Sequence, residues 1–115
     1  RTIADVRDAV RAYFILVNSD NIASGSVFNI GGSFTCKVGD ILDTLLGMSC
    51  KKGITHEIDP KRIRPIDADL QIPDISKFKS LTTWEPEISY ENTMQDLLNY
   101  WRKRIETNGN SFLQR

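Results

Sequence analysis

The sequence predicts a small mixed α/β domain, and three observations support this fold class. In several segments apolar residues recur at helical spacing, which indicates amphipathic helices. Short runs rich in Val, Ile and Phe lie between these segments and are bounded by Gly or Pro, which is typical of strands. The chain has 115 residues, which is enough for one small domain with a modest core.

The first helix is expected from about Val6 to Asn18. Aspartates at its front, Asp5 and Asp8, are placed to cap it and to complement the helix dipole. Its apolar side chains are Val6, Val10, Tyr13 and Val17, with Ala9 and Leu16. A stripe of this kind normally packs on the core of the domain.

Three further helices follow from the same periodicity. The second is capped by Thr35 and ends near Gly47; its stripe is Val38, Ile41, Leu42, Leu45 and Leu46. A short helix begins after Asp74 and includes Ile75, Phe78 and Leu81. The longest begins after Ser89, ends at Asn108-Gly109-Asn110 and carries Tyr90, Met94, Leu97, Leu98, Trp101 and Ile105. Residues 108–115 are expected to be a frayed tail.

Strands are expected to be few and short. Ser26 to Ile30, Ile54 to Ile58 and Leu70 to Ile72 have strand-like composition. They predict a sheet of two or three strands, unless the sheet continues in another part of a longer protein. Trp84, followed by Glu85-Pro86, is expected to be a turn with a large apolar anchor.

Composition excludes several classes of function. The 15 basic and 15 acidic residues cancel, so no broad positive field attracts nucleic acid or an anionic membrane. No apolar run approaches the about 20 residues that span a bilayer. Cys36 and Cys50 lack CxxC spacing and are expected to be reduced thiols of a cytoplasmic protein.

Two local features favour ordinary structural roles. The only histidine, His56, lies in a predicted strand and has no partner pattern for catalysis or metal binding. Gly31-Gly32 follows a predicted strand as a phosphate-binding loop would, but no Gly-x-Gly-x-x-Gly or P-loop pattern surrounds it. A turn is the better interpretation.

The segment from Asp59 to Asp67 is the best candidate for binding chemistry. Prolines at positions 60 and 65 stiffen the backbone around Arg64, whose guanidinium has a planar fork of donors suited to phosphate oxygens. Asp67 stands three positions later and could accept hydrogen bonds from sugar hydroxyls. A solvated basic turn with a local Arg–Asp ion pair is the alternative. Arg1 could meet the same anion if the fold brings it near Arg64.

Five sequence blocks, in order along nearly the whole chain, resemble motifs of the extended short-chain dehydrogenase/reductase superfamily. Residues 1–13 resemble R-D-F-x-x-V-x-D-x-x-x-A, residues 25–31 resemble G-x-x-[YF]-N-[IV]-G, and residues 59–67 resemble D-P-x-[RL]-x-R-P-x-[DE]. Residues 74–77 and 84–86 resemble the D-x-S-K and G-W-x-P motifs, respectively. Residues 96–101 resemble D-L-L-x-Y-W. The branch that the blocks resemble most is that of GDP-mannose 4,6-dehydratases and GDP-4-dehydro-6-deoxy-mannose reductases.

The resemblance implies that residues 1–115 form one nucleotide-sugar-binding domain, the C-terminal fragment of a Rossmann-type enzyme. The chain starts without Met inside a motif, which fits this expectation. In such enzymes an N-terminal Rossmann part binds NADP(H) and carries the Ser/Thr-Tyr-x-x-x-Lys group. By resemblance, Arg1 and Arg64 contact the diphosphate of a GDP-hexose and Asp67 holds its ribose. No catalytic, cofactor-binding or metal-binding residue is expected in the fragment.

The resemblance also implies that the fragment is inert alone and that the parent enzyme is a GDP-mannose 4,6-dehydratase-like, NADP-dependent cytoplasmic homo-oligomer. The parent could instead be a reductase or another NAD-dependent sugar epimerase or dehydratase, or the chain could be a non-enzymatic module that binds nucleotide-sugars or a partner. The sequence departs from the family pattern at Thr2 and Ile3, where Asp and an aromatic residue are usual, and at Thr83, where Gly is usual.

Overall fold

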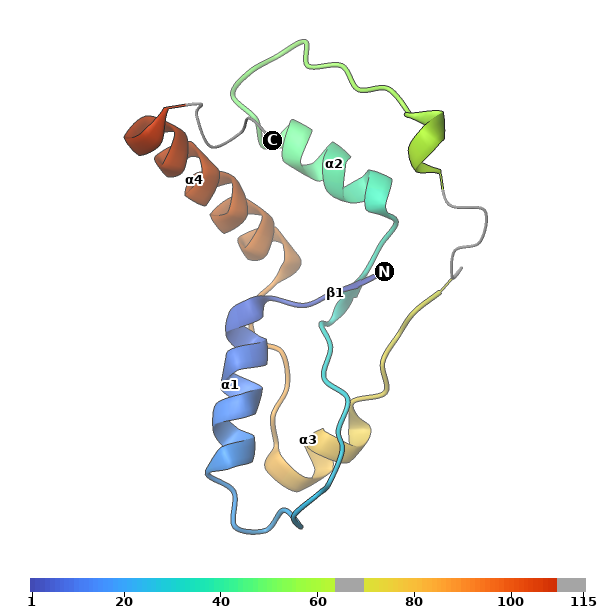
Figure 1. Cartoon of the computed structure of the whole chain (residues 1–115), viewed down its shortest axis with the longest axis vertical. Helices are drawn as coiled ribbons and strands as arrows, with labels where there is room; N and C mark the ends of the chain where they lie inside the picture. The colour runs from blue at the N-terminus through green and yellow to red at the C-terminus, as the bar shows by residue number, and fades with distance from the viewer. Residues whose placement is uncertain (64–69, 110–115) are drawn as a thin grey trace.

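The computed structural model describes residues 1–63 and 70–109; α1 and α3 lie at one end, α2 and α4 at the other, and a very small sheet lies between them (Figure 1). The elements are β1 (Thr2–Ile3), α1 (Val6–Val17), β2 (Phe34–Thr35), α2 (Val38–Gly47), a 3-10 turn η1 (Pro60–Arg62), α3 (Ser76–Thr82) and α4 (Tyr90–Asn108). This is the small mixed α/β fold that the sequence predicts.

Local capping explains where the helices begin. The carboxylate of Asp5 accepts from the backbone N–H of Arg7 at 2.8 Å at the start of α1, and the hydroxyl of Ser89 accepts from Asn92 at 3.2 Å at the start of α4. Asp74 accepts from the N–H of Ser76 at the start of α3. These side chains satisfy N–H groups that have no partner inside the helix, as predicted.

The last helix ends where the sequence predicts. Asn108 is its final residue, and the backbone N–H of Gly109 donates to the carbonyl of Ile105 at 2.9 Å. Of the tail expected at 108–115, residues 110–115 lie outside the described residues.

The cap predicted for α2 is wrong. Thr35 belongs to β2, and the helix begins after Lys37. The carboxylate of Asp40, three residues further on, accepts from the backbone N–H of Lys37 at 2.8 Å. A carboxylate in the first turn both satisfies this donor and complements the helix dipole, so the start of the helix lies two residues later than expected.

The three predicted strands are also wrong, because none of the three segments forms a backbone ladder with another strand in the described part of the chain. Among the described residues the sheet consists of β1 and β2, antiparallel, with Thr2 opposite Thr35 and Ile3 opposite Phe34. Residues 27–30 turn Phe28 and Ile30 toward the core without joining the sheet. Residues 54–58 are all exposed. Strand-like composition indicates only that a segment suits a β-ladder. A second strand must supply the backbone hydrogen-bonding partners.

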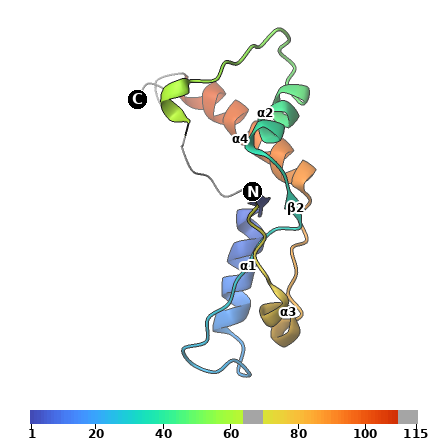
Figure 2. The same cartoon turned by 90° about the vertical axis from the view of Figure 1, so that its right-hand side faces the viewer.

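The core lies between α1, α3 and the turn before α4 (Figure 2). Its buried apolar centre is Ala12, Phe78 and Trp84, with Phe78 in tilted ring contact with Trp84 at 5.6 Å and with Phe28 at 5.3 Å. Thus the anchor role predicted for Trp84, which is 2% exposed, is confirmed. A second contact joins α2 to α4, and beside it Tyr90 of α4 stacks on Phe34 of β2 with ring centroids 4.3 Å apart.

Most of the apolar stripe predicted for α1 does not face this core, although Leu16 packs against it. Val10 is 61% exposed and Val17 is 83% exposed, whereas Asp8 and Ala12 are buried. From residue 12 to residue 17 the helix has no charged side chain, so periodicity alone could not choose the buried face. A helix that is apolar on all sides is normally covered on all sides, and here only one side is covered by the described residues.

The arrangement is also extended for its length. The radius of gyration is 17.9 Å, whereas a compact domain of this length has about 13 Å. The chain therefore buries a smaller share of its apolar surface than an independent domain of this size would.

Gly31 and Gly32 let their own segment pack closely against β1 and against the segment before α3. A Cβ on Gly32 would lie 1.5 Å from the carbonyl oxygen of Ile3, and one on Gly31 would lie 2.3 Å from Cγ of Pro73. The pair therefore serves close packing. This close packing supports the interpretation of the pair as a turn rather than a phosphate loop.

We expect Gly32→Ala to destabilise the fold by about 1–3 kcal/mol, because a methyl group must displace the backbone of β1. Gly39→Ala is the matched control: Gly39 lies in α2, and nothing stands within 4 Å of the place that its methyl group would take. That change should leave stability unchanged or raise it by about 0.5–1 kcal/mol. Urea unfolding of both variants measures the difference, and equal effects would contradict the packing explanation.

Thr83 stands where the family pattern has glycine, and its backbone conformation is unfavourable for a threonine. It ends α3 with φ 58° and ψ 6°, the left-handed region, which is unfavourable for a β-branched residue. We therefore expect Thr83→Gly to stabilise the fold by about 1 kcal/mol. Ser80→Gly, in the regular part of the same helix, should instead destabilise it by about 0.5–1 kcal/mol. Thermal unfolding midpoints should shift in opposite directions, and a parallel shift would count against backbone strain.

Candidate functional site

Asp8 is a buried carboxylate, and such groups are often functional. It is 2% exposed and accepts from the backbone N–H groups of Glu87 at 3.1 Å and Ile88 at 3.0 Å. It also pairs with Arg11 at 2.9 Å. In the opposite direction, the indole N–H of Trp84 donates to the backbone carbonyl of Asp8 at 3.2 Å. These bonds tie the first turn of α1 to the turn before α4.

Asp5 joins the same two elements one turn earlier. Its carboxylate forms a two-point pair with the guanidinium of Arg7, with both contacts at 2.9 Å, and accepts from the hydroxyl of Thr93 at 2.8 Å. Arg7 also reaches Asp96 of α4 at 2.8 Å. The junction between β1 and α1 is therefore fixed to the first two turns of α4.

Both carboxylates stay ionised. The hydrogen bond from Arg7 is the main reason why the pKa of Asp5 lies well below its usual value. For Asp8, burial is the largest influence and opposes ionisation, but the bonds from Arg11, Ile88 and Glu87 together outweigh it and lower its pKa. A carboxylate that is fully committed to backbone and arginine donors has no role as a proton carrier, so both aspartates are structural.

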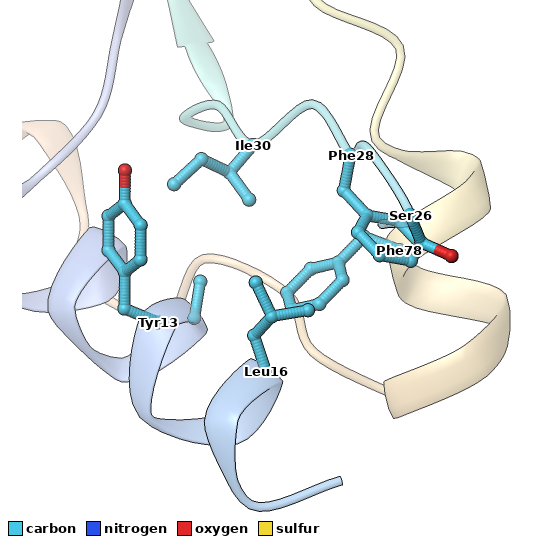
Figure 3. A pocket seen from close by; sticks show the side chains of 7 residues that line it. Tyr13, Leu16, Ser26, Phe28, Ile30 and Phe78 are labelled. Carbon is cyan, nitrogen blue, oxygen red and sulfur yellow. The ribbon is translucent and has the colours of Figure 1, made fainter. Parts of the chain in front are cut away.

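A small apolar hollow opens beside the core (Figure 3). It has a volume of about 90 Å³ and lies between α1, the segment after Gly25, and α3. Its lining is Ala12, Tyr13, Leu16, Ser26, Phe28, Ile30 and Phe78. The hydroxyls of Tyr13 and Ser26 are the only polar side-chain groups in this lining, which contains no cation. The hollow suits an apolar side chain and does not suit a diphosphate.

Arg1 lies at a different place, on the edge of the small sheet. Its amino nitrogen donates to the carbonyl of Cys36 at 2.6 Å, and its own carbonyl accepts from the N–H of Cys36 at 3.0 Å, which extends the ladder of β1 and β2 by one pair. Its guanidinium donates to the side-chain oxygen of Gln71 at 2.7 Å. The next residue, Thr2, donates its hydroxyl to the backbone carbonyl of Gln71, also at 2.7 Å.

These contacts bring together two blocks that are 70 positions apart in the sequence. Arg64 and Asp67, the other predicted ligand contacts, lie outside the described residues, in the interval 64–69. The described ends of that interval are η1, where Asp59 caps the turn and pairs with Arg62 at 3.3 Å, and Leu70 with Gln71. Gln71 follows Asp67 by four residues, and four residues of chain span at most about 14 Å.

Sequence reasoning missed Gln71. The segment 70–72 has the composition of a strand, in which a polar residue between Leu70 and Ile72 simply faces solvent. Gln71 is exposed, as that pattern predicts, but its partners come from β1 and from Arg1 beside it. No local signal marks it, because the partners are 69 and 70 positions away.

The other candidates have no site around them in residues 1–63 and 70–109. His56 is exposed in a segment without secondary structure. Cys36 and Cys50 are both free thiols. Within the part that the structure describes, no cluster of His, Cys, Asp or Glu could hold a metal ion. None of the described helices is long and apolar enough to cross a membrane.

In comparisons with known proteins, residues 1–97 match the family model described as GDP-mannose 4,6 dehydratase. The chain is also similar to a GDP-6-deoxy-D-mannose reductase from Pseudomonas aeruginosa, with 24% identity over 107 residues. That match covers 91% of this chain and 34% of the reductase. The chain therefore spans about a third of the length of this relative.

We expect Asp8→Asn to destabilise the fold by about 1.5–3 kcal/mol at pH 7, because hydrogen bonds to an ionised carboxylate are lost. Asp43→Asn, an exposed aspartate on α2, is the control and should change stability by less than about 0.5 kcal/mol. Urea unfolding at pH 7 measures both.

The pH dependence has a definite sign. Since the pKa values of Asp5 and Asp8 are lower in the folded state, their stabilisation is present above the unfolded value of about 3.9 and is lost as the pH falls further. Stability of the wild type should fall steeply below about pH 4, and Asp8→Asn should flatten that fall. An identical acid profile for the two proteins would contradict the role of Asp8.

Proposed function

This chain belongs to the GDP-mannose 4,6-dehydratase family, and we propose that it forms the domain that binds the GDP-sugar substrate in a nucleotide-sugar dehydratase or reductase. The observation that carries the proposal is the contact between Arg1 and Gln71. It joins the block that begins the chain to the segment that directly follows Arg64 and Asp67. Arg1 and the described residues that follow Arg64 and Asp67 in the sequence thus meet at one edge of the small sheet, which supports the proposal.

We assign the diphosphate to Arg1 and Arg64 and the nucleotide ribose to Asp67. An arginine pair suits a diphosphate because each guanidinium offers parallel N–H donors and a permanent positive charge. A carboxylate accepts from two neighbouring hydroxyls of a ribose. Held at both points, the hexose end of the ligand would be oriented for reaction, and fixing geometry lowers the barrier of the chemical step.

Redox chemistry would come from another part of the protein. We propose that NADP(H) is bound outside this chain, because its only double glycine packs against Ile3 and Pro73 and has no Gly-x-Gly-x-x-Gly or P-loop pattern around it. Without a cofactor site or a Tyr-x-x-x-Lys group, the chain by itself would be inert. This agrees with its span of 34% of the reductase that it resembles.

The exposed apolar surface supports a cofactor-binding part that packs on this domain. Tyr13, Phe14 and Val17 of α1 are exposed, the helix has no charged residue from 12 to 17, and the apolar hollow lies beside Tyr13. Surfaces of this kind are uncommon on independent domains. In this proposal the hollow accepts an apolar side chain of the covering part.

The reading frame before Arg1 distinguishes an enzyme from a stand-alone binding module. A glycine-rich nucleotide loop near the start of the complete gene product and a Tyr-x-x-x-Lys sequence before Arg1 would support the enzyme. A start codon directly before Arg1 would overturn it. Choosing between dehydratase, reductase and epimerase requires products to be identified from GDP-mannose and from a 4-keto GDP-sugar.

We expect Arg64→Ala to weaken GDP binding by about 1.5–3 kcal/mol, because a charge-assisted phosphate contact is lost. Asp67→Ala should weaken binding of GDP and of guanosine alike, since it acts on the ribose. Arg62→Ala is the matched control: it removes the same charge two positions away, from a side chain that is 88% exposed and paired with Asp59. Calorimetric titration of the complete gene product measures the affinities. Unchanged GDP affinity in both Arg64→Ala and Asp67→Ala would refute the assignment.

A further inference from the structure

We infer that residues 27–30 are an edge strand that a strand of the cofactor-binding part completes, so that the two parts share one β-sheet. The inference rests on the proposed function, since it concerns how the proposed cofactor-binding part is attached. It goes beyond that function by naming the backbone segment that makes the attachment and the kind of element that it binds.

The side chains of residues 27–30 alternate as they do in a strand. Phe28 and Ile30 pack against the core and line the apolar hollow (Figure 3). Val27 and Asn29 are exposed, and Val27 is 78% exposed. A period of two with one covered face is typical of an extended backbone. The segment therefore has the conformation that pairing in a sheet requires.

Within residues 1–63 and 70–109, no strand lies beside this segment. No backbone–backbone hydrogen bond in that part of the chain involves residues 27–30. The carbonyl of Val27 accepts from the ammonium of Lys77 at 2.9 Å, and this ammonium lies 4.8 Å from the ring centre of Phe28. Partly covered backbone groups are normally paired in a folded protein.

The contact of Val27 identifies the edge that remains open. In a strand the N–H and C=O of one residue point to the same edge, and those of the next residue point to the opposite edge. Val27 and Asn29 therefore present their backbone groups to the edge where Lys77 of α3 lies. Phe28 and Ile30 present theirs to the other edge, where no described residue bonds to them. A row of alternating donors and acceptors is completed by another strand.

The apolar surroundings favour a strand of a larger α/β part as the occupant. Tyr13 and Phe14 of α1 are 66% and 69% exposed, and the hollow lies between α1 and the segment. A strand added at the open edge would direct every second side chain toward α1 and place one of them in the hollow. Helices that cover neighbouring strands in this way form the layers of α/β sheets.

The length of the relative shows that such a strand has a source. The chain matches 34% of the Pseudomonas aeruginosa reductase, so about two thirds of that protein lies outside the match. A second copy of this chain would have to pair the same short segment with itself. It would also have to cover the exposed side of α1 with a surface of its own. We therefore assign the pairing strand to the cofactor-binding part.

Amide hydrogen exchange in the complete gene product tests the pairing directly. The N–H groups of Phe28 and Ile30 should exchange at least about a hundredfold more slowly than in an unstructured peptide, because both would donate to the added strand. The N–H of Asn29 points to the opposite edge and should exchange faster than both. Exchange of the Phe28 and Ile30 amides at the rate of an unstructured peptide would overturn the inference.

Photo-cross-linking identifies the occupant. A photoreactive phenylalanine at position 27 should cross-link to residues that precede Arg1 in the complete gene product, since side chains on neighbouring strands lie within reach of each other. Position 58 is the matched control, because Ile58 is 77% exposed and Val27 is 78% exposed. Position 58 should give fewer of these products. Thermal unfolding midpoints equal to wild type confirm that both variants fold.

A mixture of isotope-labelled and unlabelled protein separates cross-links within one chain from those between copies. Products that join two copies at position 27 would make a second copy the occupant and overturn the inference. Products confined to residues 1–115 would also overturn it, because no preceding strand would then lie beside the segment.

GDP titration of the same preparation tests the proposed function separately. Normal GDP binding with rapid exchange of the Phe28 and Ile30 amides would overturn the inference alone. Absence of GDP binding would overturn the proposed function, whereas slow exchange with cross-links to residues before Arg1 would still support the shared sheet. A start codon directly before Arg1 would overturn both.

Discussion

The fold depends on the carboxylate of Asp8. It accepts backbone hydrogen bonds from positions 87 and 88, and so joins the first turn of α1 to a segment about 80 residues later. Hydrogen bonds to an ionised acceptor contribute about 1.5–3 kcal/mol each, which is comparable to the burial of one large apolar side chain. The indole of Trp84, which donates to the carbonyl of Asp8, is brought into the core by the same connection. The packing of α1, α3 and α4 follows from it.

A second connection, made by Asp5, determines where Arg1 lies. Asp5 holds the junction of β1 and α1 against α4, through Thr93 and through Arg7 with Asp96. On the other side, the absence of a side chain at Gly32 lets the backbone meet Ile3 closely. Between these two restraints the short strand has little freedom, and Arg1 continues it. A two-residue strand would be a weak support for a ligand contact without such restraints at its end.

Sequence predicted the helices better than the strands, for a physical reason that particular residues show. The starts of α1, α3 and α4 are set by Asp5, Asp74 and Ser89, whose bonds stay within a few residues. Strand formation at 26–30 needed a neighbour that composition cannot supply. For α1, the apolar run from residue 12 to residue 17 made two faces equally suitable, and Asp8 selected the buried one through distant partners. At the candidate site, Arg1 was predictable from its motif, whereas Gln71 depends on contacts 70 positions away.

The departure from the family pattern at Thr2 bears on the site itself. An aspartate is usual there, and a carboxylate has no hydrogen to donate at neutral pH. Only a hydroxyl or another donor can bind the backbone carbonyl of Gln71 as Thr2 does. An aspartate beside that carbonyl would leave two acceptors facing each other and would also place a negative charge next to Arg1. The threonine therefore changes how the segment after position 69 is attached, and it does so at the residue adjacent to the proposed diphosphate contact. In this chain Thr35, Thr2, Gln71 and Arg1 are linked by hydrogen bonds that attach the segment after position 69 to both strands of the sheet.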